Sequence, residues 1–146
     1  MTDFRILSET VSASPQITTG DVAEAKAQGF AMIVNNRPDG EVPGQPAGSD
    51  IEACAAEHGL AYRAIPVGQA GFGPPQIAAM QAALAEADGK VLAYCRSGTR
   101  STFLWALARA SEGDSPETLA EAAARAGYDL NPMKDAMATL SAKARG

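Results

Sequence analysis

Blocks of apolar residues recur along the chain, and each block has the length of a strand. Residues 30–34 (FAMIV) form a continuous apolar run without polar alternation, which is typical of a strand covered on both faces. Residues 90–94 (KVLAY) predict another buried strand, and residues 60–67 predict a strand that Pro66 breaks. Residues 6–14 are rich in β-branched and small side chains and predict a strand or hairpin at an edge.

Polar caps, prolines and glycines mark out helices between and after these blocks. The predicted helices cover residues 18–29, 49–59, 75–88, 99–110 and 115–127, and a last one opens at residue 131. Ser49 or Asp50 is expected to cap the second helix, and Pro75 to start the third. The fourth is apolar on most faces, so we expect it to lie buried at the centre of the fold.

The alternation of strands and helices predicts an α/β fold. We expect a single domain over residues 1–146 with three layers, in which helices flank a mostly parallel central sheet. Ligands bind at the carboxyl ends of the strands in such sheets. Cys95, the 35–39 turn and the glycine-rich loop 68–74 all follow predicted strand ends. We therefore expect these three segments to converge on one rim.

The composition limits the expected partners and cellular location but does not indicate a function. The 146 residues are 46% hydrophobic and 20% charged, with a formal net charge of −5. An acidic chain of this kind favours neither a nucleic-acid partner nor an anionic membrane surface. The start of the chain is polar and no apolar run is long enough to span a bilayer, so a cytoplasmic location is expected. Two cysteines do not make a disulfide framework.

Residues 91–101 (VLAYCRSGTRS) carry the most specific chemistry in the sequence. They predict a buried strand, a tight loop from Cys95 to Arg100, and then a helix N-terminus. Cysteine is a nucleophile only as the thiolate, and a helix N-terminus and a neighbouring cation both stabilise that form. The segment therefore predicts a reactive thiol with an anion site beside it. The alternative interpretation is a small buried cysteine next to a surface arginine.

The backbone N–H groups of this loop lack helical partners, so we expect them to cradle an anion. Gly98 permits backbone angles that a side chain would obstruct, and Arg100 offers a fork of donors to an oxyanion. The candidate catalytic residues are Cys95, Arg100 and Ser101, and the candidate substrate-binding residues are Arg96, Ser97, Gly98, Thr99, Asn36 and Arg37.

Several other residues have two interpretations each. Asn36 and Arg37 either hold the cysteine loop or satisfy their own turn, and Phe72 either covers the pocket as a lid or lies in a plain linker. Cys54 lies in a helical pattern as a small core residue or, alternatively, as a resolving cysteine. With one histidine, His58, and no clustered cysteines, we expect neither a metal site nor a cofactor.

Different parts of this chain resemble two different families. The loop from Cys95 to Arg100 resembles the active loop of single-domain rhodanese sulfurtransferases, in which four residues separate the cysteine and the arginine. Residues 33–41 (IVNNRPDGE), residues 62–67 (YRAIPV) and the two helices after the loop resemble the dual-specificity protein tyrosine phosphatase fold. More specifically, the chain up to about residue 110 is similar to the phosphatase-like domain of bacterial beta-lactamase hydrolase-like proteins. Some of those proteins fuse this domain to a persulfide dioxygenase of the metallo-beta-lactamase fold.

Departures from the phosphatase pattern favour sulfur transfer in this reading. The resemblance implies five residues between cysteine and arginine, whereas this chain has four, which we interpret as a cup too narrow for a phosphoryl group. It also implies an aspartate general acid after the Ile-Pro-Val segment, where residues 68–71 (GQAG) offer no carboxylate. Asp39 is the candidate general acid if its turn reaches the pocket.

The resulting hypothesis is a rhodanese-like sulfurtransferase. Cys95 would take the outer sulfur of thiosulfate or glutathione persulfide, and a thiol acceptor would then remove it. Arg100 would bind the donor's anionic group, the Ser101 hydroxyl would donate to the sulfur, and Arg96 would attract the donor. The resemblance adds a persulfide dioxygenase as a partner. Two alternatives stay open: a phosphatase acting through a phosphocysteine, and a non-catalytic domain that binds an anion or a protein partner.

Overall fold

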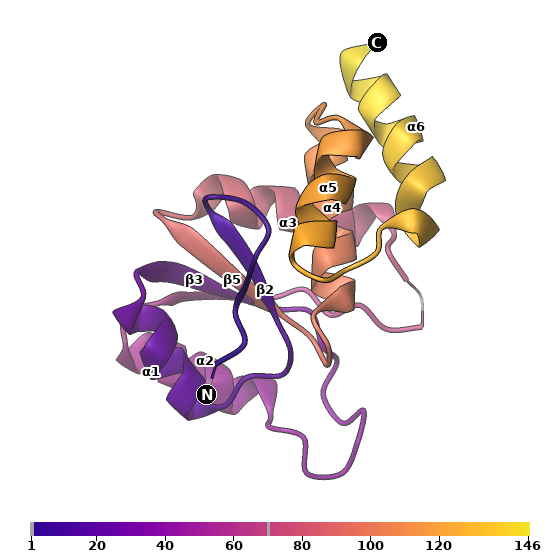
Figure 1. The fold of residues 1–146 in the computed structure, drawn as a ribbon. Helices are drawn as coiled ribbons and strands as arrows, with labels where there is room; N and C mark the ends of the chain where they lie inside the picture. Colours follow the sequence, from indigo (N-terminus) through magenta and orange to yellow (C-terminus); the bar gives the residue numbers. More distant parts are fainter. Residues whose placement is uncertain (1, 70) are drawn as a thin grey trace.

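A computed structural model describes residues 2–69 and 71–146. A five-stranded sheet with the strand order β1-β2-β5-β3-β4 forms its centre (Figure 1). The strands are β1 (Arg5–Ile6), β2 (Val11–Ser14), β3 (Phe30–Asn35), β4 (Ala61–Ala64) and β5 (Lys90–Tyr94). Only β1 runs antiparallel to its neighbour, and the other pairs are parallel. The fold is thus the predicted α/β domain with a mostly parallel sheet.

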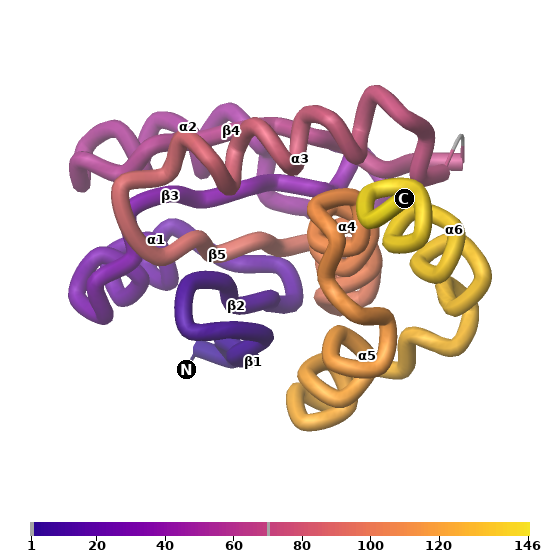
Figure 2. Tube along the Cα trace, turned by 90° about the horizontal axis from the view of Figure 1, so that it is seen from above, coloured from indigo at the N-terminus to yellow at the C-terminus, as the bar shows by residue number. Residues whose placement is uncertain are grey.

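Helices cover both faces of this sheet. They are α1 (Thr19–Ala27), α2 (Gly48–Glu57), α3 (Pro74–Glu86), α4 (Thr99–Ser111), α5 (Pro116–Arg125), the 3-10 turn η1 (Asn131–Met133) and α6 (Lys134–Arg145). α1 and α2 pack together on one face, whereas α3 and α4 pack on the other. α5 and α6 lie against α4 on its outer side, as Figure 2 shows. In the part of the chain described, no helix is long and apolar enough to cross a membrane.

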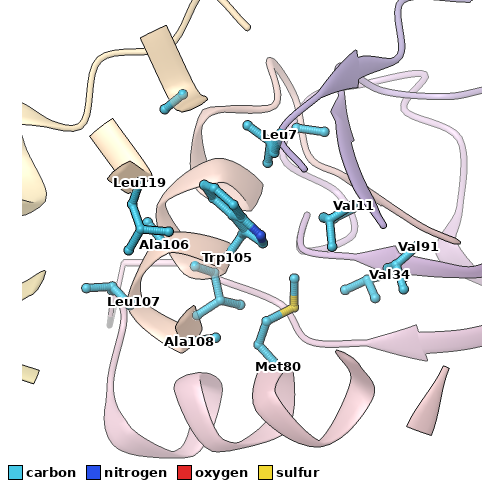
Figure 3. Packing of buried hydrophobic residues seen from close by; sticks show 14 of the residues in the cluster. Leu7, Val11, Val34, Met80, Val91, Trp105, Ala106, Leu107, Ala108 and Leu119 are labelled. Carbon is cyan, nitrogen blue, oxygen red and sulfur yellow. The ribbon is translucent and has the colours of Figure 1, made fainter. Parts of the chain in front are cut away.

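Strand residues alternate between two cores because successive side chains point to opposite faces of a sheet. Ile33 and Leu92 join the core under α1 and α2. Val34 and Val91, one position along in each strand, join the core under α3 and α4. Figure 3 shows this second core, in which Met80 and Trp105 lie toward the sheet. Two-sided burial explains why residues 30–34 read as a continuous apolar run.

The structure corrects the predicted ends of several elements. The hairpin predicted at the sheet edge is present, with β1 as the edge strand and β2 paired with both β1 and β5. α2 begins at Gly48 with Ala47 as its N-cap, so neither Ser49 nor Asp50 is the cap. α3 already starts at Pro74. The last helix opens with the 3-10 turn η1 before α6 begins. Element ends are decided by local hydrogen bonding, which composition specifies weakly.

Candidate active site

The strand β5 delivers Cys95 to the N-terminus of α4. Cys95 itself is buried, with 1% of its surface exposed. The Gly98 N–H donates to its Sγ across 3.1 Å. Gly98 is the N-cap of α4 and has a φ of 92°, in the left-handed region that side chains avoid. This conformation turns the N–H back toward the sulfur, so the loop and the helix start together surround the thiol.

The guanidinium of Arg100 lies in the first turn of α4 and points at a loop from another part of the chain. It donates to both carboxylate oxygens of Glu41, across 2.7 and 2.8 Å, and to the Val67 carbonyl across 2.8 Å. Hydrogen bonding to Glu41, with a smaller contribution from nearby Cys95, raises the pKa of Arg100. Arg100 therefore stands between the cysteine and a fixed carboxylate.

Glu41 is shared between two arginines. Its Oε1 also accepts from Arg37 Nε across 2.9 Å, and the Arg37 side chain is only 4% exposed. Arg37 is further held by Gln16, whose Oε1 accepts from it across 3.0 Å. Hydrogen bonds from Arg100, supported by Arg37, lower the pKa of Glu41 from 4.5 to about 2. Glu41 is consequently an ionised group at neutral pH.

Asn36 ties the carboxyl end of β3 to the start of α4. The Ser101 hydroxyl donates to Asn36 Oδ1 across 2.8 Å, and Asn36 Nδ2 donates to the Ile65 carbonyl across 2.9 Å. Both Asn36 and Ser101 are fully buried. The Ser101 hydroxyl thus donates to Asn36 in this arrangement, rather than to the cysteine sulfur as expected from the sequence. Of the two interpretations of Asn36, this contact matches the one in which it holds the cysteine loop.

Three loops meet beside this constellation, as the sequence predicted. A cavity of about 560 Å³ is lined by Pro38, Asp39, Gly40, Glu41, Gly68, Gln69, Arg96 and Arg100. Asp39 is exposed, and its Oδ1 accepts from the Gly48 N–H across 2.8 Å. Cys95 is buried and is not among the lining residues. Ala70, which belongs to the predicted 68–74 loop, falls outside the described residues.

The remaining predicted residues take different places. Ser97 and Thr99 bond to each other through their hydroxyls across 2.9 Å, on the exposed side of the loop. Phe72 packs against Phe103, with ring centroids 5.9 Å apart, and joins the core rather than covering the cavity. Cys54 is half-buried in α2 and contacts the Thr19 carbonyl. Among the described residues, no three His, Cys, Asp or Glu side chains gather as metal ligands would.

Two residues of the site escaped the sequence analysis. Glu41 closes the motif at residues 33–41 and lies four positions after Arg37, a spacing that could have suggested the ion pair. Tyr128 donates to the Ser97 carbonyl across 3.0 Å from the segment between α5 and α6. Thirty-one residues separate the two partners, so no local pattern indicates this contact.

Fold and site together define a class: an α/β domain with a cysteine–arginine loop at the start of a central helix, of the dual-specificity phosphatase-like fold. The family model described as "Beta-lactamase hydrolase-like protein, phosphatase-like domain" matches residues 3–112. The chain belongs to this family.

Curated relatives agree with this assignment. Beta-lactamase hydrolase-like proteins from Xylella fastidiosa and Agrobacterium fabrum are 37% and 40% identical, over 85% and 71% of this chain. The matches cover only 29% and 24% of those proteins, so the chain spans less than a third of their length.

Solved structures show the same fold. A protein from Neisseria meningitidis, described provisionally as a phosphatase, is 28% identical with a TM-score of 0.83 and covers 96% of this chain and 99% of its own. The kinase associated phosphatase is 15% identical with a TM-score of 0.73, over 100% of this chain and 96% of its own. This second likeness concerns the fold alone.

These comparisons overturn the sulfurtransferase hypothesis, because the family model and the similar structures are phosphatase-like. Both arguments behind that hypothesis were also incomplete. Residue count sets the length of a loop but not where its N–H groups point, which the left-handed Gly98 decides. Moreover, residues 68–71 lack a carboxylate, but another loop brings two of them, Asp39 and Glu41, to the same cavity. The sulfur donor and acceptor expected as partners belonged to that hypothesis, and the comparisons do not test them.

Proposed function

We propose that this domain is a cysteine-dependent phosphatase that hydrolyses phosphate monoesters. The observation that carries the proposal is the placement of Cys95 Sγ at the N-terminus of α4. There Sγ accepts a hydrogen bond from the Gly98 N–H, and Arg100 lies in the first turn of the same helix. Backbone N–H groups at a helix start stabilise both a thiolate and a bound anion. Membership of a phosphatase-like family supports this reading of the site.

The reaction follows in two displacements. The Cys95 thiolate attacks the phosphorus atom, a sulfur–phosphorus bond forms, and the ester oxygen leaves with its bonding electrons and takes up a proton. Water then attacks the phosphocysteine, the sulfur–phosphorus bond breaks, and inorganic phosphate and the thiolate are released. Loop N–H groups and the Arg100 fork would hold the three non-bridging oxygens during both steps.

Arg100 must change partners before it can hold a phosphoryl group. In the structure its donors are taken by Glu41 and the Val67 carbonyl. A phosphate dianion carries more charge than the carboxylate and also offers a fork of acceptors, so it can replace Glu41 on Arg100. Arg37 still pairs with Glu41 Oε1 after that exchange, which keeps the displaced carboxylate from being left without a cation.

Asp39 is the proposed general acid. It lines the cavity beside Arg96 and Arg100. Glu41, the other carboxylate of this cavity, cannot donate a proton near neutral pH because its pKa lies at about 2. Asp39 is exposed rather than enclosed around the leaving group, so the domain should prefer aryl phosphates, whose leaving groups need less protonation.

Hydrolysis of para-nitrophenyl phosphate tests this function. The wild-type chain is expected to release para-nitrophenol with saturation, and Cys95→Ser is expected to lower kcat by roughly a thousandfold or more. Cys54→Ser is the matched control, because it changes the other cysteine, in α2 away from the cavity lining. A wild-type chain without turnover, or a Cys95→Ser variant that keeps it, would refute the proposal.

A further inference from the structure

Tyr128 and Cys95 bond to opposite ends of one peptide group. The Tyr128 hydroxyl donates to the Ser97 carbonyl across 3.0 Å, and the Gly98 N–H donates to Cys95 Sγ across 3.1 Å. The Ser97 C=O and the Gly98 N–H belong to the same planar amide, in which they point in opposite directions. Any rotation of this amide that breaks one hydrogen bond therefore weakens the other.

This amide needs an external restraint. Glycine populates positive and negative φ about equally, so a peptide group next to Gly98 can turn over at small cost. The hydroxyls of Ser97 and Thr99 bond to each other on the outer side of the loop, so they do not hold the Ser97 carbonyl in place. A turned amide would direct its carbonyl oxygen toward the sulfur and destabilise a thiolate. The Tyr128 hydroxyl opposes that rotation.

Tyr128 is itself held firmly. It is 7% exposed, and the Arg5 guanidinium lies 5.2 Å from the centre of its ring. Arg5 also donates to the Ala126 carbonyl across 3.3 Å, next to Tyr128 along the chain. Burial raises the pKa of Tyr128, so its hydroxyl stays protonated and remains a donor. A Cβ at Gly98 would overlap the Tyr128 Oη, which shows how closely the two residues fit.

We propose that Tyr128 is a positioning residue for the nucleophile: its hydroxyl fixes the Ser97–Gly98 amide with the N–H on Cys95 and thereby stabilises the thiolate. Hydrogen bonds linked through one amide also polarise each other, which strengthens the bond to sulfur. Tyr128 lies beyond residues 3–112, the part that the family model matches. The helical segment after α4 thus contributes to the site. This inference rests on Cys95 acting as the nucleophile of the proposed function.

The test is the pH dependence of Cys95 alkylation by iodoacetamide, measured in a Cys54→Ser background so that one thiol reacts. In Tyr128→Phe the midpoint of the rate profile should rise by about half a pH unit or more. For para-nitrophenyl phosphate, kcat should fall roughly three- to tenfold with a smaller change in KM. Tyr62→Phe is the matched control, since it removes a different tyrosine hydroxyl, which bonds to Asn35, and should leave the alkylation midpoint in place.

A folded Tyr128→Phe chain with an unchanged alkylation midpoint would overturn the inference, whatever its effect on stability. If this variant does not fold, tyrosine labelled with ¹³C at Cζ serves in the wild-type chain. The Tyr128 signal should then titrate with the same midpoint as the alkylation rate, and a signal that does not move refutes the link. Alkylation needs no phosphate ester, so the two proposals fail separately. A midpoint shift without any hydrolysis refutes only the phosphatase function, and hydrolysis without a midpoint shift refutes only the role of Tyr128.

Discussion

The carboxylate of Glu41 grips the guanidinium of Arg100 with two hydrogen bonds, of 2.7 and 2.8 Å, although 59 residues separate them in the sequence. A planar carboxylate on a planar guanidinium is the same two-pronged geometry with which arginine binds phosphate. In the proposed reaction, two oxygens of the phosphate substrate would take the place that Glu41 occupies on Arg100. Under this proposal, substrate binding is an exchange in which the phosphate replaces the Glu41 carboxylate on Arg100.

Glu41→Gln should therefore bind phosphate more tightly. The amide keeps the size of the side chain but no longer competes as an anion for Arg100, so the inhibition constant of orthophosphate should fall roughly three- to tenfold. Competitive inhibition of para-nitrophenyl phosphate hydrolysis measures it. Glu86→Gln, which removes the exposed ion pair with Arg63, is the control. An unchanged or higher constant in Glu41→Gln would show that Glu41 only holds Arg100 in position.

The pKa of Glu41 also sets a pH window for stability. In the folded chain it is lowered from 4.5 to about 2, mainly by Arg100. Above pH 4.5 the carboxylate is ionised in both folded and unfolded chains, and the ion pairs contribute fully. As the pH falls from about 4.5 to about 2, the unfolded chain takes up a proton that folded Glu41 does not, so this contribution is lost. Urea unfolding should show a gap between wild type and Glu41→Gln at neutral pH that closes toward pH 2. A gap that stays constant across this range contradicts the assignment.

Asp39→Asn should reveal a general acid through its dependence on the leaving group. Asparagine keeps an oxygen that can accept from the Gly48 N–H, so the local turn should persist. Phenyl phosphate hydrolysis should slow by about ten- to a hundredfold, whereas para-nitrophenyl phosphate, with its better leaving group, should be affected far less. Asp50→Asn in the first turn of α2 is the control. Equal losses with both esters would remove Asp39 from the acid role.

Gly98→Ala should both destabilise the fold and abolish thiol reactivity. The new Cβ would overlap the Tyr128 hydroxyl and lie 3.3 Å from the Ser14 carbonyl carbon, at a φ of 92°. A loss of at least about 2 kcal/mol in the free energy of unfolding is expected. Gly44→Ala is the matched control, because Gly44 has a φ of 79° with nothing within 4 Å, so only the backbone strain is added. Thermal unfolding and iodoacetamide reactivity give both readouts, and equal losses in the two variants would contradict the clash.

The central part of the fold was predictable because its signals are local. Residues 30–34 and 90–94 read as buried strands since both faces of the sheet are covered, and the structure confirms β3 and β5 there. The placement of Cys95 directly before a helix N-terminus follows from the same local reading. Cap residues were harder, as Ala47 shows, since a helix can begin without a side-chain cap when its neighbours fix the turn.

The chemistry of the site was predicted less well because it depends on distant segments. Counting the residues between Cys95 and Arg100 indicated a narrow cup, but the direction of an N–H depends on a backbone angle at Gly98. Residues 68–71 offered no acid, and the sequence could name Asp39 only on the condition that its turn reaches the pocket. The structure brings that turn to the cavity together with Glu41, which the sequence analysis had not considered.

The sequence by itself determined the strand–helix order and the family, and it placed a cysteine and an arginine together at a helix start. Those features depend on hydrophobic periodicity and on residues that are neighbours in the chain. Only the tertiary structure decided what those residues touch: Glu41 on Arg100, Asn36 on Ser101 and Tyr128 on the cysteine loop. Each of these contacts closes a loop of 31 residues or more, and such a contact is fixed by the packing of the whole domain rather than by any local preference.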